Sequence, residues 1–544
     1  MIYLIVTMYI QSNAKKVGSK TYRSFLLVQN YREAGKVKHK VLSNLSSLPM
    51  SLIEGIRALI KGKVFTNLKD LELKSGKNFG GLFVLRELAK ELNIEKILGN
   101  SRQGKLAMLL VLGRILTQGS RRHLTFWREG EAIEEVLGLK SFDEDDLYET
   151  LDWLEKNQAK MEDQWFKLRF ENEKVELFLY DVTSSYLEGE KNELAEYGYN
   201  RDGKRGKKQI VIGLLTNKNG NPIAVEVFKG NTSDVTTVPN QIKKKAERFG
   251  VSEVTFVGDR GMVKKIPTEL FKEHNWHYIT AITKPQIKSL IKENVFQLEL
   301  FEEKLVEIIQ DKNRYFLRRN PQRVLEIEKN RKDRMQKITT LCEKLNEKLK
   351  AHPKASPEIA LKDLENKIHQ LKLKWIMIAN IKDRVLSLSM DADALQKSSQ
   401  LDGCYAIKTD LSYEKINDLS YEKINAEEAH SIYKGLSEVE WAFRTMKTGL
   451  LEIRPLYHRE ANRTRACAFV AMLAYAITQS LWKKTAHLDR PLKTVILSLD
   501  QIQTQEIKIA DQWVTILPTN FRGDQDLILK ALKIQFPKTI RNTA

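Results

Sequence analysis

The chain has 544 residues, with 90 Lys and Arg against 70 Asp and Glu, so its formal net charge is +20. That length allows three or more domains, and the excess of cations favours a polyanionic partner such as nucleic acid. The longest apolar segment, residues 467–482, is too short to span a bilayer and includes three polar residues. The opening segment MIYLIVTMYI lacks a basic n-region and a cleavage site, so we expect a β-strand there and no signal peptide.

The three cysteines, Cys342, Cys404 and Cys467, are far apart in the sequence, and none belongs to a C-x-x-C pair. This spacing argues against a disulfide framework and against a structural zinc site. We therefore expect a protein of the reducing cytoplasm that does not bind a membrane.

The pattern of the first 170 residues changes from strands to helices near residue 50. Residues 1–50 are predicted to form short strands, with a turn at Gly35, and from Ser51 to Phe170 apolar residues recur at helical spacing. The segment SRRHLTFWR (120–128) adds cations and aromatic rings to these helices. Two interpretations remain open: a DNA-reading module, or a helical bundle with a charged exterior.

Apolar strand patterns follow, and two of them are predicted to end at an aspartate. The first strand of a predicted antiparallel meander ends at Asp181, and a later buried strand ends just before Asp259, after a predicted helix over residues 238–249. In an α/β sheet, carboxylates at strand ends are open to ligands. Taken alone, each Asp is better explained as a capping or turn residue.

The segment from Tyr433 to Leu450 contains no proline and is predicted to be one helix. Tyr433, Glu440 and Lys447 are spaced seven residues apart, which is about 20° of drift per step, so we expect them on one face. A solvated, amphipathic surface helix is the alternative. With the two aspartates, however, Glu440 completes a set of three carboxylates that suits a pair of Mg²⁺ or Mn²⁺ ions.

The motifs YDVTSSY around Asp181, GDRGM around Asp259 and the helix with Glu440 resemble the three signature regions of DDE-type insertion-sequence transposases. The spacing of Tyr433 and Lys447 about the glutamate resembles the Tyr-x2-Arg-x3-Glu-x6-Lys signature of one prokaryotic subgroup. The resemblance covers at least residues 175–482.

The resemblance implies an α/β protein with an RNase H-like core, in which Asp181, Asp259 and Glu440 hold the two metal ions. It implies an enzyme that binds the terminal inverted repeats of a mobile DNA element, cleaves there and joins the 3′ ends to target DNA. A homodimer in the DNA complex and a nucleoid-associated place in a prokaryotic cytoplasm follow from the same likeness. A structure-specific nuclease with the same triad, or a DNA-binding derivative without chemistry, are the alternatives.

The resemblance also implies that Tyr433 and Lys447 contact the terminal phosphates. The Arg position of the signature is occupied by Leu436, and Arg444 is the expected substitute, although an ion pair with Glu440 is the alternative. The remaining candidates for DNA contact are cations beside the core: Arg454, His458, Lys204, Arg205, Lys207 and Lys208.

We expect six parts along the chain. They are a strand-rich region (1–50), a helical region that is a candidate DNA-end-binding domain (51–170), the first part of the core (171–285), a large helical insertion (286–400), the second part of the core with the helix of Glu440 (401–484) and a C-terminal tail (485–544). The insertion is predicted to contain two long antiparallel helices. Trp375 either stacks on a displaced base or fills the core of that hairpin.

A perfect tandem repeat, DLSYEKIN, occupies residues 410–417 and 418–425, just before the helix of Glu440. It is too short for a solenoid repeat and most resembles a slipped duplication of the gene. Together with Leu436 it leaves open whether this copy still cleaves DNA.

Overall fold

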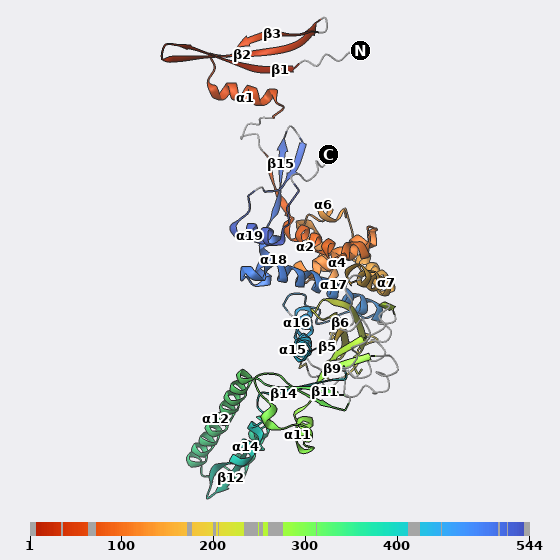
Figure 1. Cartoon of the computed structure of the whole chain (residues 1–544), viewed down its shortest axis with the longest axis vertical. Helices are drawn as coiled ribbons and strands as arrows, with labels where there is room; N and C mark the ends of the chain where they lie inside the picture. Colours follow the sequence, from red (N-terminus) through yellow and green to blue (C-terminus); the bar gives the residue numbers. More distant parts are fainter. Residues whose placement is uncertain are drawn as a thin grey trace. The chain divides into compact units, whose positions relative to one another are not determined.

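The computed structural model describes residues 7–33, 36–63, 72–170, 177–199, 203–204, 206–232, 248–249, 254–258, 276–311, 313–411, 425–447, 449–509, 512–518 and 520–537. The chain divides into two compact units (Figure 1). The first comprises Met1–Lys77, Gln503–Thr519 and Phe536–Ala544, and the second comprises Asn78–Ile502 and Asn520–Gln535.

The first unit contains two small sheets. One is antiparallel and consists of β1 (Thr7–Val17), β2 (Lys20–Glu33) and β3 (Lys36–Asn44). Helix α1 (Met50–Ile60) packs on one face of this sheet through a cluster of buried side chains: Ile10, Phe25, Leu45 and Ile53. The other sheet joins distant parts of the sequence in the order β16 (Gln512–Ile516), β15 (Gln503–Ile509) and β4 (Leu73–Asn78).

The second unit begins with helices, as predicted. They are α2 (Gly80–Glu91), α3 (Ile94–Leu98), α4 (Arg102–Leu116), α5 (Arg121–Trp127), η2 (Arg128–Gly130), α6 (Ile133–Leu137) and α7 (Glu144–Phe170). Ser101 and Ser120 cap α4 and α5, because each hydroxyl accepts a hydrogen bond from the backbone N–H three residues later.

Helix α17 (Ala461–Thr485) is buried along most of its length and packs against α4, α7 and α2. The middle of this helix, residues 466–477, is apolar on all sides, which is typical of a core helix. After it come η4 (Ala486–Leu488), α18 (Leu492–Asp500) and α19 (Gly523–Leu532). No helix among the described residues is long and apolar enough to cross a membrane.

The central sheet has the strand order β10-β11-β14-β9-β8-β5-β6-β7. Strands β5 (Leu177–Tyr186), β6 (Gln209–Asn217) and β7 (Pro222–Lys229) form the predicted antiparallel meander, and β8 (Val254–Gly258) and β9 (Trp276–Ala281) continue from β5 in parallel. This mixed α/β sheet confirms the predicted RNase H-like core. The helix predicted over residues 238–249 lies outside the described residues, except for its last two.

Different helices pack against the two faces of this sheet. Phe178, Tyr180 and Val182 of β5 belong to a buried cluster with Phe166 and Phe170 of α7. Because alternate residues of a strand point to opposite faces, the neighbours of these three side chains on β5 point to the other face. Helices α15 (Ala426–Lys434) and α16 (Leu436–Lys447) lie against that face.

The insertion contains the two predicted long helices, α12 (Pro321–Ala351) and α13 (Pro357–Gln370), which pack together (Figure 1). Each begins with a capping residue followed by proline, Asn320 and Ser356 being the caps. The remaining elements are α11 (Lys284–Lys292), η3 (Leu298–Leu300), β10 (Val306–Gln310), β11 (Asn313–Arg319), β12 (Met377–Lys382), β13 (Val385–Met390), α14 (Ala392–Ser399) and β14 (Cys404–Thr409).

The segment predicted as a helical insertion within the core, residues 286–400, also contains strands. Strands β10 and β11 extend the central sheet beyond β14, so part of the insertion is built onto the core. The sequences of β10 and β11 contain only short apolar runs between charged residues. These segments form strands because β11 pairs with β14 and β10 pairs with β11. Trp375 does not fill the helical hairpin: the residue is 42% exposed, and the centre of its ring lies 5.9 Å from the Arg331 guanidinium.

Candidate active site

Asp181 lies in the middle of β5, opposite Leu214 of β6, and not at the end of the strand as predicted. The strand continues because the residues that follow, Val182 to Tyr186, keep pairing with β6, and β-branched and hydroxyl side chains suit a paired strand. The Asp181 side chain is partly buried, and its Oδ1 accepts a hydrogen bond of 2.8 Å from the Val182 backbone N–H.

The predicted helix from Tyr433 to Leu450 is divided at Gly435 into α15 and α16. Gly435 allows a close approach to β5: a Cβ atom there would lie 3.3 Å from Leu179 Cδ1 and 3.2 Å from the Lys218 carbonyl oxygen. Leu179 and Asp181 are two residues apart on one strand, so they share a face of the sheet. The start of α16 therefore lies on the face to which Asp181 belongs.

Glu440 and Arg444 lie on the exposed side of α16, one turn apart, whereas Val439 and Ala442 are buried. The structure thus brings two of the three predicted carboxylates, Asp181 and Glu440, to the same side of the central sheet.

Asp259 lies outside the described residues. The strand that precedes it in the sequence, β8, is next to β5, and the register pairs Val257 with Leu179. Among the described residues no three Asp, Glu, His or Cys side chains form a group that holds a metal. Two of the predicted metal ligands, Asp181 and Glu440, are thus described, and both supply carboxylate oxygens on one side of the sheet, which suits a divalent metal ion.

Two predicted phosphate contacts on these helices differ in exposure. Tyr433 is partly buried near the end of α15. Lys447, the last residue of α16, has only 9% of its surface exposed, although Lys447 and Glu440 nominally share a helix face. Their surroundings differ because the C-terminal turn of α16 is buried from Thr445 onward.

His458 is buried, with 8% of its surface exposed, which argues against the predicted contact with DNA phosphate. Its ring packs edge-on against Tyr148, with the centroids 6.4 Å apart, and its carbonyl accepts a hydrogen bond of 2.8 Å from Asn192 Nδ2. The segment before it pairs with the end of β5, since Leu456 bridges to Leu187. Arg454 in that segment is partly buried.

The basic loop before β6 contains exposed lysines with nearby partners. Lys207 forms an ion pair of 2.6 Å with Glu188, and Lys204 lies 5.8 Å from the ring of Tyr186. Lys208 lies 5.8 Å from the ring of Tyr197. Arg205 is outside the described residues.

A buried cluster of Cys467, Arg114, Arg121 and His458, here called the Cys467 cluster, was missed by sequence reasoning. Arg114 Nη2 and Arg121 Nη1 lie 4.0 Å and 3.9 Å from Cys467 Sγ. Burial raises the pKa of this thiol, but the neighbouring His458 and the two arginines outweigh burial and lower the pKa to about 5. No local sequence motif predicts this cluster, because its members come from α4, α5, α17 and the segment before α17.

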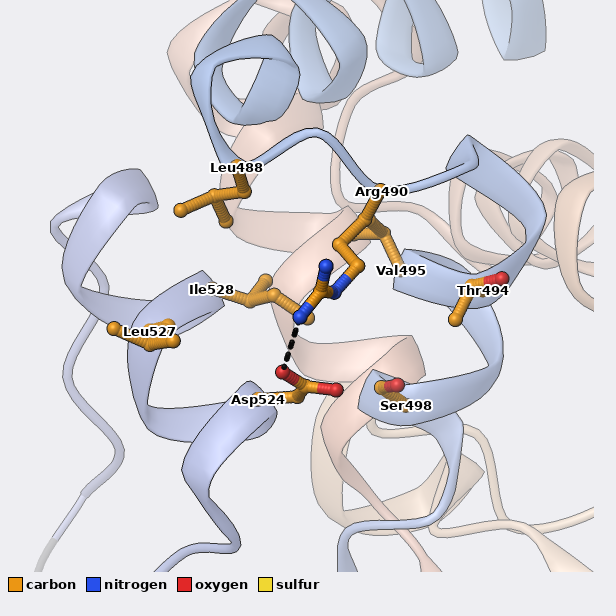
Figure 2. Close-up of a pocket in the computed structure, with 8 residues that line it drawn as sticks. All are labelled: Leu488, Arg490, Thr494, Val495, Ser498, Asp524, Leu527 and Ile528. Carbon is orange, nitrogen blue, oxygen red and sulfur yellow. Dashed lines mark hydrogen bonds and ion pairs between the residues drawn. The ribbon is translucent and has the colours of Figure 1, made fainter.

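A small pocket lies between α18 and α19, far along the sequence from the carboxylates (Figure 2). Leu488, Val495 and Ile528 contribute apolar walls, and Arg490 Nη2 lies 3.5 Å from Asp524 Oδ1. The lining also contains the hydroxyls of Thr494 and Ser498, but its one carboxylate, Asp524, is paired with Arg490 and a divalent metal ion needs several oxygen ligands, so we assign this pocket no metal site.

The order of the central sheet, with carboxylates on β5 and α16, is compatible with a nucleic-acid enzyme of the DDE class. Residues 173–477 match the transposase DDE domain, and residues 10–70 match the N-terminal domain of the IS1634 family transposases. A search of curated proteins finds no match. Because the DDE match spans more than half of the sequence, the chain belongs to the DDE transposases, which cleave DNA and transfer its strands.

Proposed function

We propose that Asp181, Asp259 and Glu440 hold two divalent metal ions at the side of the central sheet against which α15 and α16 lie. The observation that carries this proposal is the close approach of Gly435 to Leu179, which brings α16 to the face of β5 that includes Asp181. Carboxylate oxygens are the ligands that Mg²⁺ and Mn²⁺ prefer. When bound, such a pair supplies an activated water or 3′-hydroxyl and stabilises the leaving oxygen of the phosphodiester.

The residues of the chain have separate tasks in this proposal. Asp181 is held by the paired strand and by its contact with the Val182 N–H, so it supplies a fixed ligand. Glu440 is exposed on α16 and reaches the metal ions from the helix. Arg444, one turn further and exposed, binds the phosphate beside the cleaved bond in place of the arginine that Leu436 replaces.

The proposed DNA partners are the terminal inverted repeats of the element and the target duplex, which a homodimer of the chain holds together in the nucleoid. Tyr433 and Lys447 fit the Tyr-Arg-Glu-Lys subgroup by their spacing. Lys447 is the last residue of α16 and is largely buried, so a phosphate bound by its amine would lie beside the end of this helix. Arg444 is exposed and is the more accessible cation.

The test is cleavage and strand joining by the purified chain with Mg²⁺ or Mn²⁺, on a duplex that carries one element end. Asp181→Asn, Asp259→Asn and Glu440→Gln are each expected to abolish cleavage and leave binding of the uncleaved duplex within about twofold, because each removes a metal ligand. Glu427→Gln is the matched control, since Glu427 is an exposed carboxylate on the neighbouring helix α15.

Retained cleavage in any of the three variants would remove that residue from the metal site. Cleavage without joining by the unaltered chain would favour a nuclease, and binding without cleavage would show that this copy is catalytically impaired.

A further inference from the structure

The positive charge of the chain is concentrated near its N-terminus. Residues 7–63 contain eleven Lys and Arg and only two acidic residues, a net charge of +9 out of the +20 of the whole chain. The helical region from 78 to 170 contains 14 Lys and Arg and 16 Asp and Glu, a net charge of −2. A polyanion is attracted to the first of these regions and not to the second.

The ion pairs of the helical region reduce its attraction for phosphate further. Arg86 pairs with Glu95 at 2.6 Å, and Arg102 pairs with Asp146 at 2.6 Å. These arginines support the packing of α2, α3, α4 and α7, and a phosphate would have to displace their carboxylates. The net charge, more than the pairing, therefore disfavours the helical region as the main DNA-binding surface, because Lys38 in the first region is ion-paired as well.

The sheet of β1, β2 and β3 presents its cations in an ordered way. The register pairs Glu33, Tyr31 and Gln29 of β2 with Lys36, Lys38 and Lys40 of β3. Lys36, Lys38 and Lys40, here called the lysine row, therefore lie on one face of the sheet, with successive members about 7 Å apart. All three are exposed, and Lys38 also pairs with Glu33 at 2.5 Å.

A second group of exposed cations lies at the other end of the sheet, around the turn between β1 and β2. It consists of Lys15, Lys16, Lys20 and Arg23. Tyr22 lies opposite Lys15 in the register and is 59% exposed, so an aromatic ring accompanies the cations. Cations with interleaved aromatic rings are typical of surfaces that bind nucleic acid.

The dimensions of the sheet fit a duplex. Among the described residues β1 pairs with β2 only as far as Asn30, and beyond it β2 and β3 continue alone as a two-stranded antiparallel tip to Glu33 and Lys36. The major groove of B-DNA admits such a two-stranded ribbon. Strand β3 is also an edge of its sheet, so one side of the ribbon is not occupied by a further strand of that sheet. Helix α1 covers only the part of the sheet near Ile10 and Phe25.

We propose that the sheet of β1, β2 and β3 is the surface by which this transposase engages duplex DNA, and that the lysine row contacts the phosphate backbone. This inference rests on the proposed function, and it places the DNA contact in the strand-rich region instead of the helical region predicted from the sequence. Each lysine on a phosphate releases condensed counterions, so binding through the row becomes weaker as salt is added.

The test is equilibrium binding of the full chain to a 30-bp duplex of arbitrary sequence, in EDTA, at salt concentrations from 50 to 200 mM. Replacing Lys36, Lys38 and Lys40 together by Ala is expected to reduce the slope of log K against log salt by about 2.7, from three contacts at about 0.9 each. The ratio of the variant Kd to the wild-type Kd should accordingly shrink about 40-fold across that range.

Two control variants separate charge from structure. The triple replacement of the lysine row by Arg keeps the charge and should keep the wild-type slope. Replacement of three exposed cations of the helical region, Lys96, Arg122 and Lys140, by Ala removes the same charge from the competing surface and should leave the slope unchanged. Thermal unfolding of each variant shows whether it is folded.

An unchanged slope in the alanine variant of the lysine row, or a reduced slope only in the helical variant, would overturn the proposal. Lysines on an edge strand also prevent pairing with another chain, so self-association of the alanine variant with an unchanged slope would show that the row only protects the edge. Because the assay contains no divalent metal, Asp181→Asn should bind with the wild-type slope, and a failure of the metal proposal is distinguishable from a failure of this one.

Discussion

Cys467 is expected to be a buried thiolate whose charge stabilises the contact between the helical region and α17. The two arginines beside it come from α4 and α5, and the thiol is 3% exposed on α17. The pKa of the thiol is lowered from 9.0 to about 5. Four pKa units at about 1.4 kcal/mol each correspond to about 5 kcal/mol of stability linked to this proton.

The sign of the pH dependence follows from a pKa that is lower in the folded chain. The contribution of the thiolate is fully present above the pKa of the unfolded thiol, near 9, decreases as the pH falls and is lost at about 5. The free energy of unfolding by urea, measured from pH 5 to 9, should therefore rise with pH more steeply in the wild type than in Cys467→Ser. The serine variant should also be less stable at pH 7, because it leaves two arginines without their counter-charge.

Cys342 and Cys404 supply the matched controls, because burial raises the pKa of both thiols. With both replaced by Ser, the thiolate absorbance near 240 nm should titrate with a midpoint near pH 5 and come from Cys467 alone. A midpoint above pH 8, or parallel stability curves for wild type and Cys467→Ser, would refute the assignment of a thiolate.

Two further predictions concern Glu131 and Gly435. Burial raises the pKa of Glu131 to about 8. The free energy of unfolding should therefore fall by up to about 5 kcal/mol as the pH rises from about 4.5, where the carboxyl ionises in the unfolded chain, to about 8. Glu131→Gln should abolish this fall, as measured by urea unfolding, and an unchanged pH dependence would contradict the prediction. Gly435→Ala is favoured by helix propensity, but it places a Cβ 2.9 Å from the Ile432 carbonyl oxygen. We expect this variant to lower the free energy of unfolding by about 1–3 kcal/mol and to reduce DNA cleavage. A more stable and equally active variant would show that the close approach does not position α16.

The sequence predicts the elements of the core better than their ends. The meander, the buried strand before Asp259 and the long helices of the insertion are found as expected, because their apolar periodicity is strong. The break at Gly435 and the continuation of β5 past Asp181 depend on packing against other elements, which local patterns do not contain. The sequence likewise does not reveal that His458 is buried, because the ring of His458 packs against Tyr148, about 300 residues away in the sequence.

The tandem repeat before the helix of Glu440 leaves both of its anchors intact. Asp410, the first residue of the first copy, accepts a hydrogen bond of 2.8 Å from the Tyr278 N–H of β9. Asn425, the last residue of the second copy, caps α15 by accepting a hydrogen bond of 2.8 Å from the Glu428 N–H. A perfect duplication keeps the first and last residues of the original segment, so both contacts survive it. Doubling the length of a loop costs only about 0.6 kcal/mol of closure entropy, and the duplication is therefore compatible with a correctly placed Glu440.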